Sequence, residues 1–232
     1  MNKTPQTITL TQLPEVLAAR FQREPEITCY LSSNAAVPTA SITAITNALR
    51  ARSPKLPFFK MVHLLLQGEV PYVEKGLQDR IMTYTIFSTG VVRDAANDGR
   101  AYYLPCTLAN LEGLVGKGRH YQPDVTIIKV SQNPFTGEYS LGLSCEAIHT
   151  AIENSKLVVA ELDPSMPFTA GQSIVDACSI DYIIEQGVLP VWEMPKPDFS
   201  NLSPEENRIG ELIAKHFITD GSTLQVGIGK IP

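Results

Sequence analysis

The stretch EITCYLSSNAAVPTASITAITNALRAR, residues 26–52, indicates the fold class. Its first six residues suit a buried strand, and the small residues that follow suit a loop. Residues 41–52 then place Ile42, Ile45 and Leu49 on one stripe at helical spacing. The stretch therefore predicts a strand, a loop and a helix in direct succession, which is the repeating unit of an α/β protein.

The same alternation continues along the chain. Further strands are expected at 58–66, 82–89, 100–106, 124–132, 156–167 and 180–186, and further helices at 10–22, 91–98, 108–115 and 145–155. The clearest strand is DVTIIKVSQ at 124–132. Strands that are apolar on both faces and alternate with helices predict an α/β fold, an open, mostly parallel sheet with helices on both faces.

Prolines divide the chain near its carboxyl end. The segment PVWEMPKPDFSNLSP, residues 190–204, holds four of the seventeen prolines, and proline disfavours regular structure. The expected organisation is an α/β domain at 1–190, a proline-rich linker at 191–203, and the first helix and strand of a truncated second domain at 204–232.

The helix expected in the second domain has a clear start. Ser203 can cap it, with Pro204 at its first position and Glu206 at its third, which is a capping box. A strand is expected at 222–226. Because the helix carries apolar residues, we expect this tail to be disordered, docked on the first domain, or paired with another copy in a homo-oligomer.

Composition excludes several function classes. The net charge of −5 and the scattered Lys and Arg argue against nucleic-acid binding. No window approaches the roughly 20 apolar residues of a membrane span, and the amino terminus does not resemble a signal peptide. The four cysteines and four histidines lack metal-ligand spacing, so we expect no metal site and free thiols in a cytoplasmic protein.

Five colinear segments resemble one family. They are HLLLQGEVPYVE (63–74), FSTGVVRDAANDGRAYYLPC (87–106), DVTIIKVSQNPFTGEYSLG (124–142), KLVVAELDPSMPFTAG (156–171) and DGSTLQVGIGKIP (220–232). Together they resemble the acetyl-CoA hydrolase/transferase family, which includes CoA transferases that act on acetate, butyrate, succinate and 4-hydroxybutyrate. The resemblance runs from about residue 30 to the last residue.

The resemblance implies a mechanism. Family members have two similar open α/β domains, and a glutamate of the second domain attacks the acyl-CoA thioester. A mixed anhydride and then a glutamyl-CoA thioester form, and a carboxylate or water completes the cycle. By resemblance, the catalytic glutamate lies beyond residue 232. No catalytic residue is assigned within this chain, coenzyme A enters as a substrate thioester, and no permanently bound cofactor is expected.

The resemblance also implies substrate or CoA contacts. They are expected at Asn34, Ala35, Gly90, Arg93, Ser131, Met166, Pro167, Gly227 and Gly229. Backbone N–H groups of the 32–38 loop suit an oxyanion, although related proteins tend to carry glycines in this loop, which here has Asn34, Ala35, Ala36 and Val37. Arg93 suits a carboxylate or a CoA phosphate.

Other carboxylates and other functions stay open at this stage. Glu161 ends an expected buried strand and is expected to titrate abnormally, and Asp163 needs a partner if it is buried. Two alternatives compete with the transferase: a non-catalytic module that binds acyl-CoA or another small ligand, and an α/β enzyme of the sugar-phosphate isomerase type. The sequence indicates neither the acyl group and its acceptor nor the choice between transferase and hydrolase.

Overall fold

The computed structural model describes residues 4–193 and 201–227, and the chain divides into two units, Met1–Glu193 and Met194–Pro232. The first unit contains β1 (Gln6–Thr7), α1 (Leu13–Arg20), β2 (Glu26–Leu31), α2 (Thr39–Ala51), β3 (Phe58–His63), β4 (Ile81–Thr85), α3 (Gly90–Asn97), β5 (Ala101–Tyr103), α4 (Leu111–Val115), β6 (Val125–Gln132), β7 (Tyr139–Ser140), α5 (Ile148–Asn154), β8 (Leu157–Leu162), β9 (Ile174–Val175) and β10 (Tyr182–Ile184). The second unit contains α6 (Pro204–Phe217).

The sheet of the first unit is parallel along its main path. Its strands lie in the order β1-β10-β8-β6-β2-β3-β4-β5, and every neighbouring pair in this order is parallel. The chain builds outward from β2 through β3 and β4 to β5, and then returns to place β6 on the other side of β2. The strand order therefore reverses between β2 and β6.

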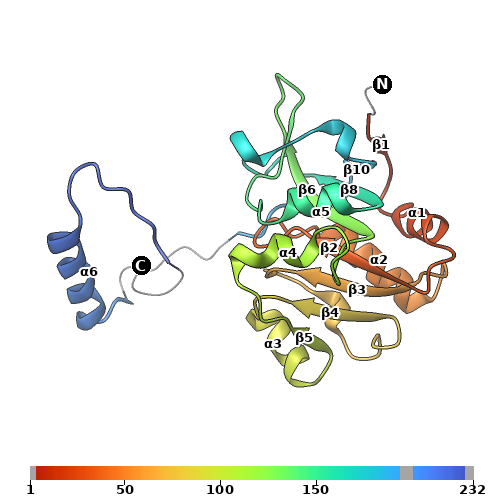
Figure 1. Cartoon of the computed structure of the whole chain (residues 1–232), viewed down its shortest axis with the longest axis horizontal. Helices are drawn as coiled ribbons and strands as arrows, with labels where there is room; N and C mark the ends of the chain where they lie inside the picture. The colour runs from red at the N-terminus through yellow and green to blue at the C-terminus, as the bar shows by residue number, and fades with distance from the viewer. Residues whose placement is uncertain (1–3, 194–200, 228–232) are drawn as a thin grey trace. The chain divides into compact units, whose positions relative to one another are not determined.

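Helices cover both faces of this sheet (Figure 1), as side-chain alternation requires. Ile27, Cys29 and Leu31 of β2 belong to one buried cluster, together with apolar residues of α1 and α2. Tyr30, between them, belongs to a second cluster with α4 and α5. The α/β fold with an open parallel sheet is confirmed, and each predicted strand and helix of the first unit appears, most of them shortened at their ends.

Three short strands escaped sequence analysis. They are β1, which extends the parallel edge, and β7 and β9, which form an antiparallel arm on β6. Each is two residues long. Two residues are too few for any periodicity, so only the neighbouring strand defines them.

The second unit contains the expected capping box. The Ser203 hydroxyl accepts from the Glu206 amide at 3.1 Å, and the Ser203 amide donates to the Glu206 carboxylate at 2.8 Å. The strand expected at 222–226 does not form, because no described segment pairs with it. A lone extended segment gains no ladder hydrogen bonds, so local β-propensity is insufficient. The assignment of 204–232 to a second domain stays a prediction.

Candidate functional site at the carboxyl edge of the sheet

The reversal between β2 and β6 is the natural place for a ligand. In open α/β sheets, the loops that leave neighbouring strands in opposite directions open a crevice at the carboxyl ends of those strands. Here the 32–38 loop after β2 and the end of β6 lie at that edge of the sheet. The loop connects β2 to α2.

Buried serines fix the path of the 32–38 loop. The Ser32 hydroxyl donates to the Ala36 carbonyl at 2.7 Å and accepts from the Lys129 amide of β6 at 3.1 Å. The Ser33 amide donates to the Ser144 hydroxyl at 2.8 Å, and the Ser33 hydroxyl accepts from the Leu64 amide at 3.3 Å. The loop is thus tied to β6, to the segment after β3 and to the segment before α5.

Asn34 turns the loop. Its φ of +57° lies in the left-handed region, which asparagine tolerates better than most residues. Its amide donates to the Leu65 carbonyl at 2.9 Å, and Asn34 forms an isolated bridge with Leu66. Among the described residues, no acceptor is recorded for the amides of Ala35 and Val37. Ala35 is half-buried and Val37 is buried, so their amides are the two backbone donors of this loop that we carry forward as candidates for an anionic oxygen.

Three buried charges lie behind the loop. Lys129, on β6, is fully buried, and its Nζ lies 3.6 Å from Glu161 Oε2 and 3.4 Å from Asp163 Oδ2. The same Nζ donates to the Leu189 carbonyl beyond β10. A buried ammonium needs this degree of pairing, because an isolated ion would be strongly disfavoured in the interior.

Glu161 caps a helix from another strand. Pro38, the N-cap of α2, offers no side-chain acceptor, and the Ser41 amide in the first turn donates instead to Glu161 Oε1 at 2.5 Å. The positive end of the helix dipole favours a carboxylate there. Burial nevertheless outweighs the nearby Lys129 and Ser41, so the pKa of Glu161 is raised, as the sequence led us to expect.

Asp163 has the partners that a buried carboxylate requires. Burial alone would raise its pKa, but the Ser165 hydroxyl and amide donate to it at 2.6 and 2.8 Å. Lys129 adds a positive charge, and the pKa of Asp163 falls below its usual value. Asp163 therefore stays ionised in the folded protein near neutral pH.

The structure brings several predicted site residues together in two groups. Asn34 and Ala35 lie in the loop, and Asn34 is linked through Leu66 to the start of α3, because the Thr89 hydroxyl donates to the Leu66 carbonyl at 3.0 Å. Gly90 follows directly, and no atom lies within 4 Å of the position that a Cβ would occupy there. The backbone at Gly90 is open to close approach.

Arg93 lies on the exposed surface of α3. Among the described residues, no ion pair joins its guanidinium to Asp94 or Asp98, the two neighbours that could neutralise it. Asp98 pairs instead with Arg100 at 3.0 Å. The Arg93 charge remains available to a ligand.

The second group lies beyond β6 and β8. Ser131 is buried and its hydroxyl donates to the Pro167 carbonyl at 3.3 Å. Met166 is also buried, and its side chain packs on Gly142, where a Cβ would lie 2.8 Å from Met166 Cγ. Ser131 and Met166 are engaged internally, whereas Pro167 is exposed, and substrate contacts at all three stay predictions.

The remaining predicted residues belong to the second unit. Gly227 is exposed and has no regular secondary structure, and Gly229 lies outside the described residues.

Lys129 and Trp192 were missed by sequence analysis. Lys129 lies among Ile127, Ile128 and Val130 in the strand expected at 124–132, and a lone lysine in that apolar run was the available signal. Trp192, the only tryptophan, donates its amide to the Ala35 carbonyl at 3.0 Å. Nothing in a proline-rich segment predicts that contact.

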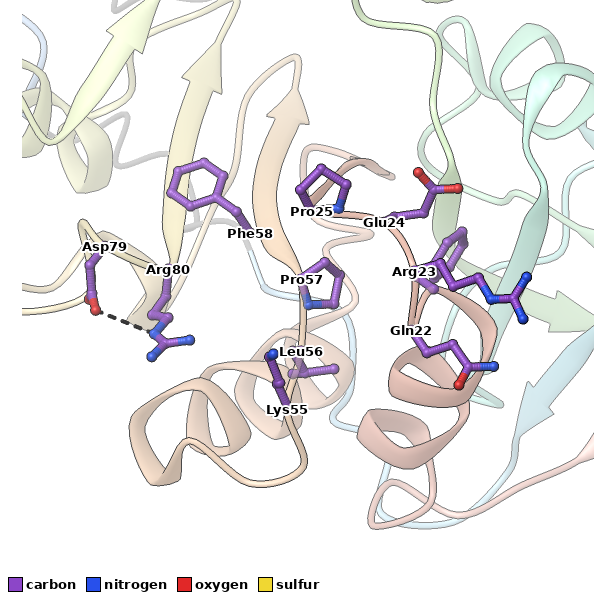
Figure 2. Close-up of a pocket in the computed structure, with 11 residues that line it drawn as sticks. Gln22, Arg23, Glu24, Pro25, Lys55, Leu56, Pro57, Phe58, Asp79 and Arg80 are labelled. Atoms are coloured by element: carbon purple, nitrogen blue, oxygen red, sulfur yellow. Dashed lines mark ion pairs between the residues drawn. The ribbon is translucent and has the colours of Figure 1, made fainter.

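A cavity of about 550 Å³ opens at the opposite edge (Figure 2). It is bordered by the segments that precede β2, β3 and β4, and Lys55, Arg80 and Glu24 lie around it, with Arg80 paired to Asp79 at 3.3 Å. None of the predicted site residues lines it. Ligands of parallel sheets bind at carboxyl ends, so this cavity is not the candidate site.

Two further properties concern the part of the chain that the structure describes. There, no group of three or more His, Cys, Asp and Glu side chains is arranged to hold a metal ion. Likewise, none of the described helices has the length and apolar character needed to cross a membrane. All four cysteines are unpaired.

Residues 17–193 match the family described as acetyl-CoA hydrolase/transferase N-terminal domain. The chain belongs to this family. It is 36% identical over 188 residues to the 4-hydroxybutyrate coenzyme A transferase of Clostridium kluyveri, covering 81% of this chain and 42% of that protein. It is 30% identical over 204 residues to the succinyl-CoA:acetate/propanoyl-CoA:succinate CoA transferase of Fasciola hepatica, covering 88% and 41%.

Solved structures share the fold. RipA from Yersinia pestis superimposes with a TM-score of 0.81 at 20% identity, covering 98% of this chain and 52% of RipA. A 4-hydroxybutyrate CoA-transferase from Porphyromonas gingivalis gives 0.68 at 25% identity, covering 98% and 49%. The chain spans about two fifths of the length of the two curated relatives.

Proposed function

We propose that this chain supplies the amino-terminal domain of an enzyme that moves CoA between a short-chain acyl-CoA and a carboxylate. The family match over residues 17–193 carries the proposal. The curated relatives support it, because their names describe CoA transfer between acyl-CoA thioesters and carboxylates. No observation favours a sugar-phosphate isomerase.

The 32–38 loop is the part of this chain closest to the chemistry. Attack on a thioester places negative charge on its carbonyl oxygen, which preorganised N–H donors stabilise. We assign the amides of Ala35 and Val37 as these donors, because neither donates to a backbone carbonyl among the described residues and both follow the left-handed turn at Asn34. The loop therefore acts as an oxyanion site, and the absence of glycine from it does not remove its backbone donors.

The nucleophile is a glutamate outside these 232 residues. Its carboxylate attacks the acyl carbon and displaces CoA thiolate. The acyl group and the glutamate are then joined as a mixed anhydride. The thiolate then attacks the glutamyl carbonyl and releases the acyl group as a carboxylate, leaving a glutamyl-CoA thioester. A second carboxylate attacks the glutamyl-CoA thioester and displaces CoA thiolate, which then attacks the acceptor carbonyl of the new anhydride, gives the product acyl-CoA and frees the glutamate. In a hydrolase, water attacks the thioester and releases CoA and the glutamate. Glu161 is unsuited to this role, because it is fully buried and caps α2.

Arg93 is the proposed partner of the acceptor carboxylate or of a CoA phosphate. It is an exposed cation at the carboxyl edge without a recorded ion-pair partner among the described residues. Coenzyme A is then a substrate rather than a resident cofactor. Cytoplasmic location, a homo-oligomer, and a second domain that begins with α6 belong to the same proposal.

The test is CoA transfer by the whole gene product. We expect transfer from acetyl-CoA or succinyl-CoA to isotopically labelled short carboxylates, and faster turnover with carboxylate than with water alone. Arg93→Ala should raise KM for the carboxylate or for the acyl-CoA at least tenfold. Arg23→Ala, at the amino-edge cavity, is the matched control and should change neither constant.

Two outcomes contradict the proposal. Tight binding of acyl-CoA without any transfer or hydrolysis would make the protein a non-catalytic binding module. An equal rise in KM in Arg93→Ala and Arg23→Ala would show that Arg93 is not a specific partner of the carboxylate or the acyl-CoA.

A further inference from the structure

A short segment after β10 contacts both β6 and the loop that follows β2. Residues 187–193, called the strap from here on, follow β10 and end the first unit. The Leu189 carbonyl accepts from Lys129 Nζ on β6, and the Trp192 amide donates to the Ala35 carbonyl after β2. These contacts join the strap, which follows β10, to Lys129 of β6 and to the 32–38 loop.

The far end of the strap rests on Gly68. The Trp192 indole lies so close that a Cβ at Gly68 would be 2.9 Å from its Cδ1 atom. Gly68 also has a φ of +77°, which disfavours any other residue. The indole of Trp192, the only tryptophan of the chain, therefore packs directly on the backbone of the segment after β3.

The strap contacts the peptide group between the two available donors. The Ala35 carbonyl, held by the Trp192 amide, belongs to the peptide that joins Ala35 to Ala36. The free amides of Ala35 and Val37 lie on either side of that peptide. Fixing its orientation limits the directions in which both amides can point, because peptide groups are planar and rigid.

We propose that Trp192 and Lys129 are positioning residues that hold the 32–38 loop in its oxyanion-binding geometry through the strap. The inference rests on the proposed function for its role in catalysis, although the mechanical link can be tested without activity. Lys129 fixes the strap at its middle, and its own amide holds Ser32 at the start of the loop. Trp192 fixes the far end.

The mechanical test is hydrogen exchange of the 232-residue chain. Trp192→Ala and Gly68→Ala should each lower the protection of the Asn34 and Ala36 amides at least tenfold, because each change removes the packing of the Trp192 indole on Gly68. Gly76→Ala is the matched control: Gly76 has a φ of +94°, but no atom lies within 4 Å of the place that a Cβ would take, so the change adds backbone strain without touching the strap. Trp192→Phe, which keeps an aromatic ring, should retain most protection.

The catalytic test uses the whole gene product. In Trp192→Ala and Gly68→Ala, kcat for CoA transfer should fall at least tenfold, KM for the carboxylate should change less than twofold, and Trp192→Phe should restore most of kcat. A merely structural role would instead lower the fraction of active enzyme in proportion to lost stability, and Gly76→Ala would show the same loss.

The outcomes separate the two proposals. Unchanged protection of the loop in both Trp192→Ala and Gly68→Ala overturns the strap, as does an unchanged kcat in an active enzyme. If the wild type transfers no CoA, the proposed function fails, and the exchange result alone decides whether the strap holds the loop. Should Trp192→Ala fail to fold, Gly68→Ala and Trp192→Phe still give the comparison.

Discussion

Replacing Lys129 by methionine tests the buried charge cluster. The substitution keeps the apolar stem and leaves Glu161, fully buried, without the ammonium that lies 3.6 Å away. At an effective dielectric constant of about 20, that pair interacts by about 5 kcal/mol. Without Lys129, Glu161 can take up a proton instead of staying charged. Protonating a carboxyl group of ordinary pKa costs about 4 kcal/mol at pH 7, so the loss of stability does not exceed that value. We expect Lys129→Met to lower the free energy of unfolding by about 3–4 kcal/mol at pH 7.

Urea unfolding followed by Trp192 fluorescence measures this loss in the first unit. Lys60→Met is the control, because Lys60 pairs with Glu26 at 2.6 Å on a neighbouring strand but remains partly exposed, and should lose about 1 kcal/mol or less. The double variant Lys129→Met/Glu161→Gln should recover at least half of the loss, because no buried carboxylate stays unpaired at that position.

The pH dependence gives a second readout of the same cluster. The pKa of Glu161 is already raised in the folded state, so its contribution to stability is present at low pH and is lost as the pH rises through the folded pKa. Removing Lys129 raises that pKa further. The loss in Lys129→Met should therefore shrink by more than about 1 kcal/mol from pH 7.5 to pH 5.5. A loss no larger than that of Lys60→Met, at every pH, would refute the reasoning.

Other outcomes concern single positions. Burial lowers the pKa of His63 to about 3, so stability is fully present above its usual pKa of 6.5 and falls on acidification; the wild type should lose about 2 kcal/mol more than His63→Phe between pH 7.5 and pH 5 in urea unfolding. Gly142→Ala, with φ +59° and Met166 in contact, should lose about 1–3 kcal/mol more than Gly137→Ala, with φ +75° and its nearest atom at 4.0 Å, in the same assay. Ser203→Ala removes the cap of α6 and should lower the hydrogen-exchange protection of that helix about fivefold. The first expectation fails if the wild type and His63→Phe lose equal stability on acidification. The second fails if Gly142→Ala and Gly137→Ala lose equal stability, and the third fails if hydrogen exchange in α6 is unchanged.

Local patterns sufficed for the sheet and its helices. The apolar runs of β2 and β6 and the helical stripe of α2 are encoded in neighbouring residues, so their positions could be predicted. The two-residue strands could not, and neither could the absence of a strand at 222–226, because strand formation depends on a partner rather than on propensity alone.

The site was predictable only in part. The loop after β2 could be assigned by its place between strand and helix, and Glu161 by its position at the end of a buried strand. The link from Lys129 to Leu189, and from Trp192 to Ala35, joins residues 60 and 157 positions apart in sequence. Such contacts arise from strand order, which places β6 between β8 and β2, and no local pattern contains that order.

A trapped intermediate tests the central claim most directly. The whole gene product is incubated with acyl-CoA alone, and the peptides are then examined by mass spectrometry for a glutamate that carries CoA as a thioester. We predict one such adduct, on a glutamate outside residues 1–232, that disappears when a carboxylate acceptor is added. An adduct on a residue of this chain, or steady CoA transfer without any adduct, would contradict the account.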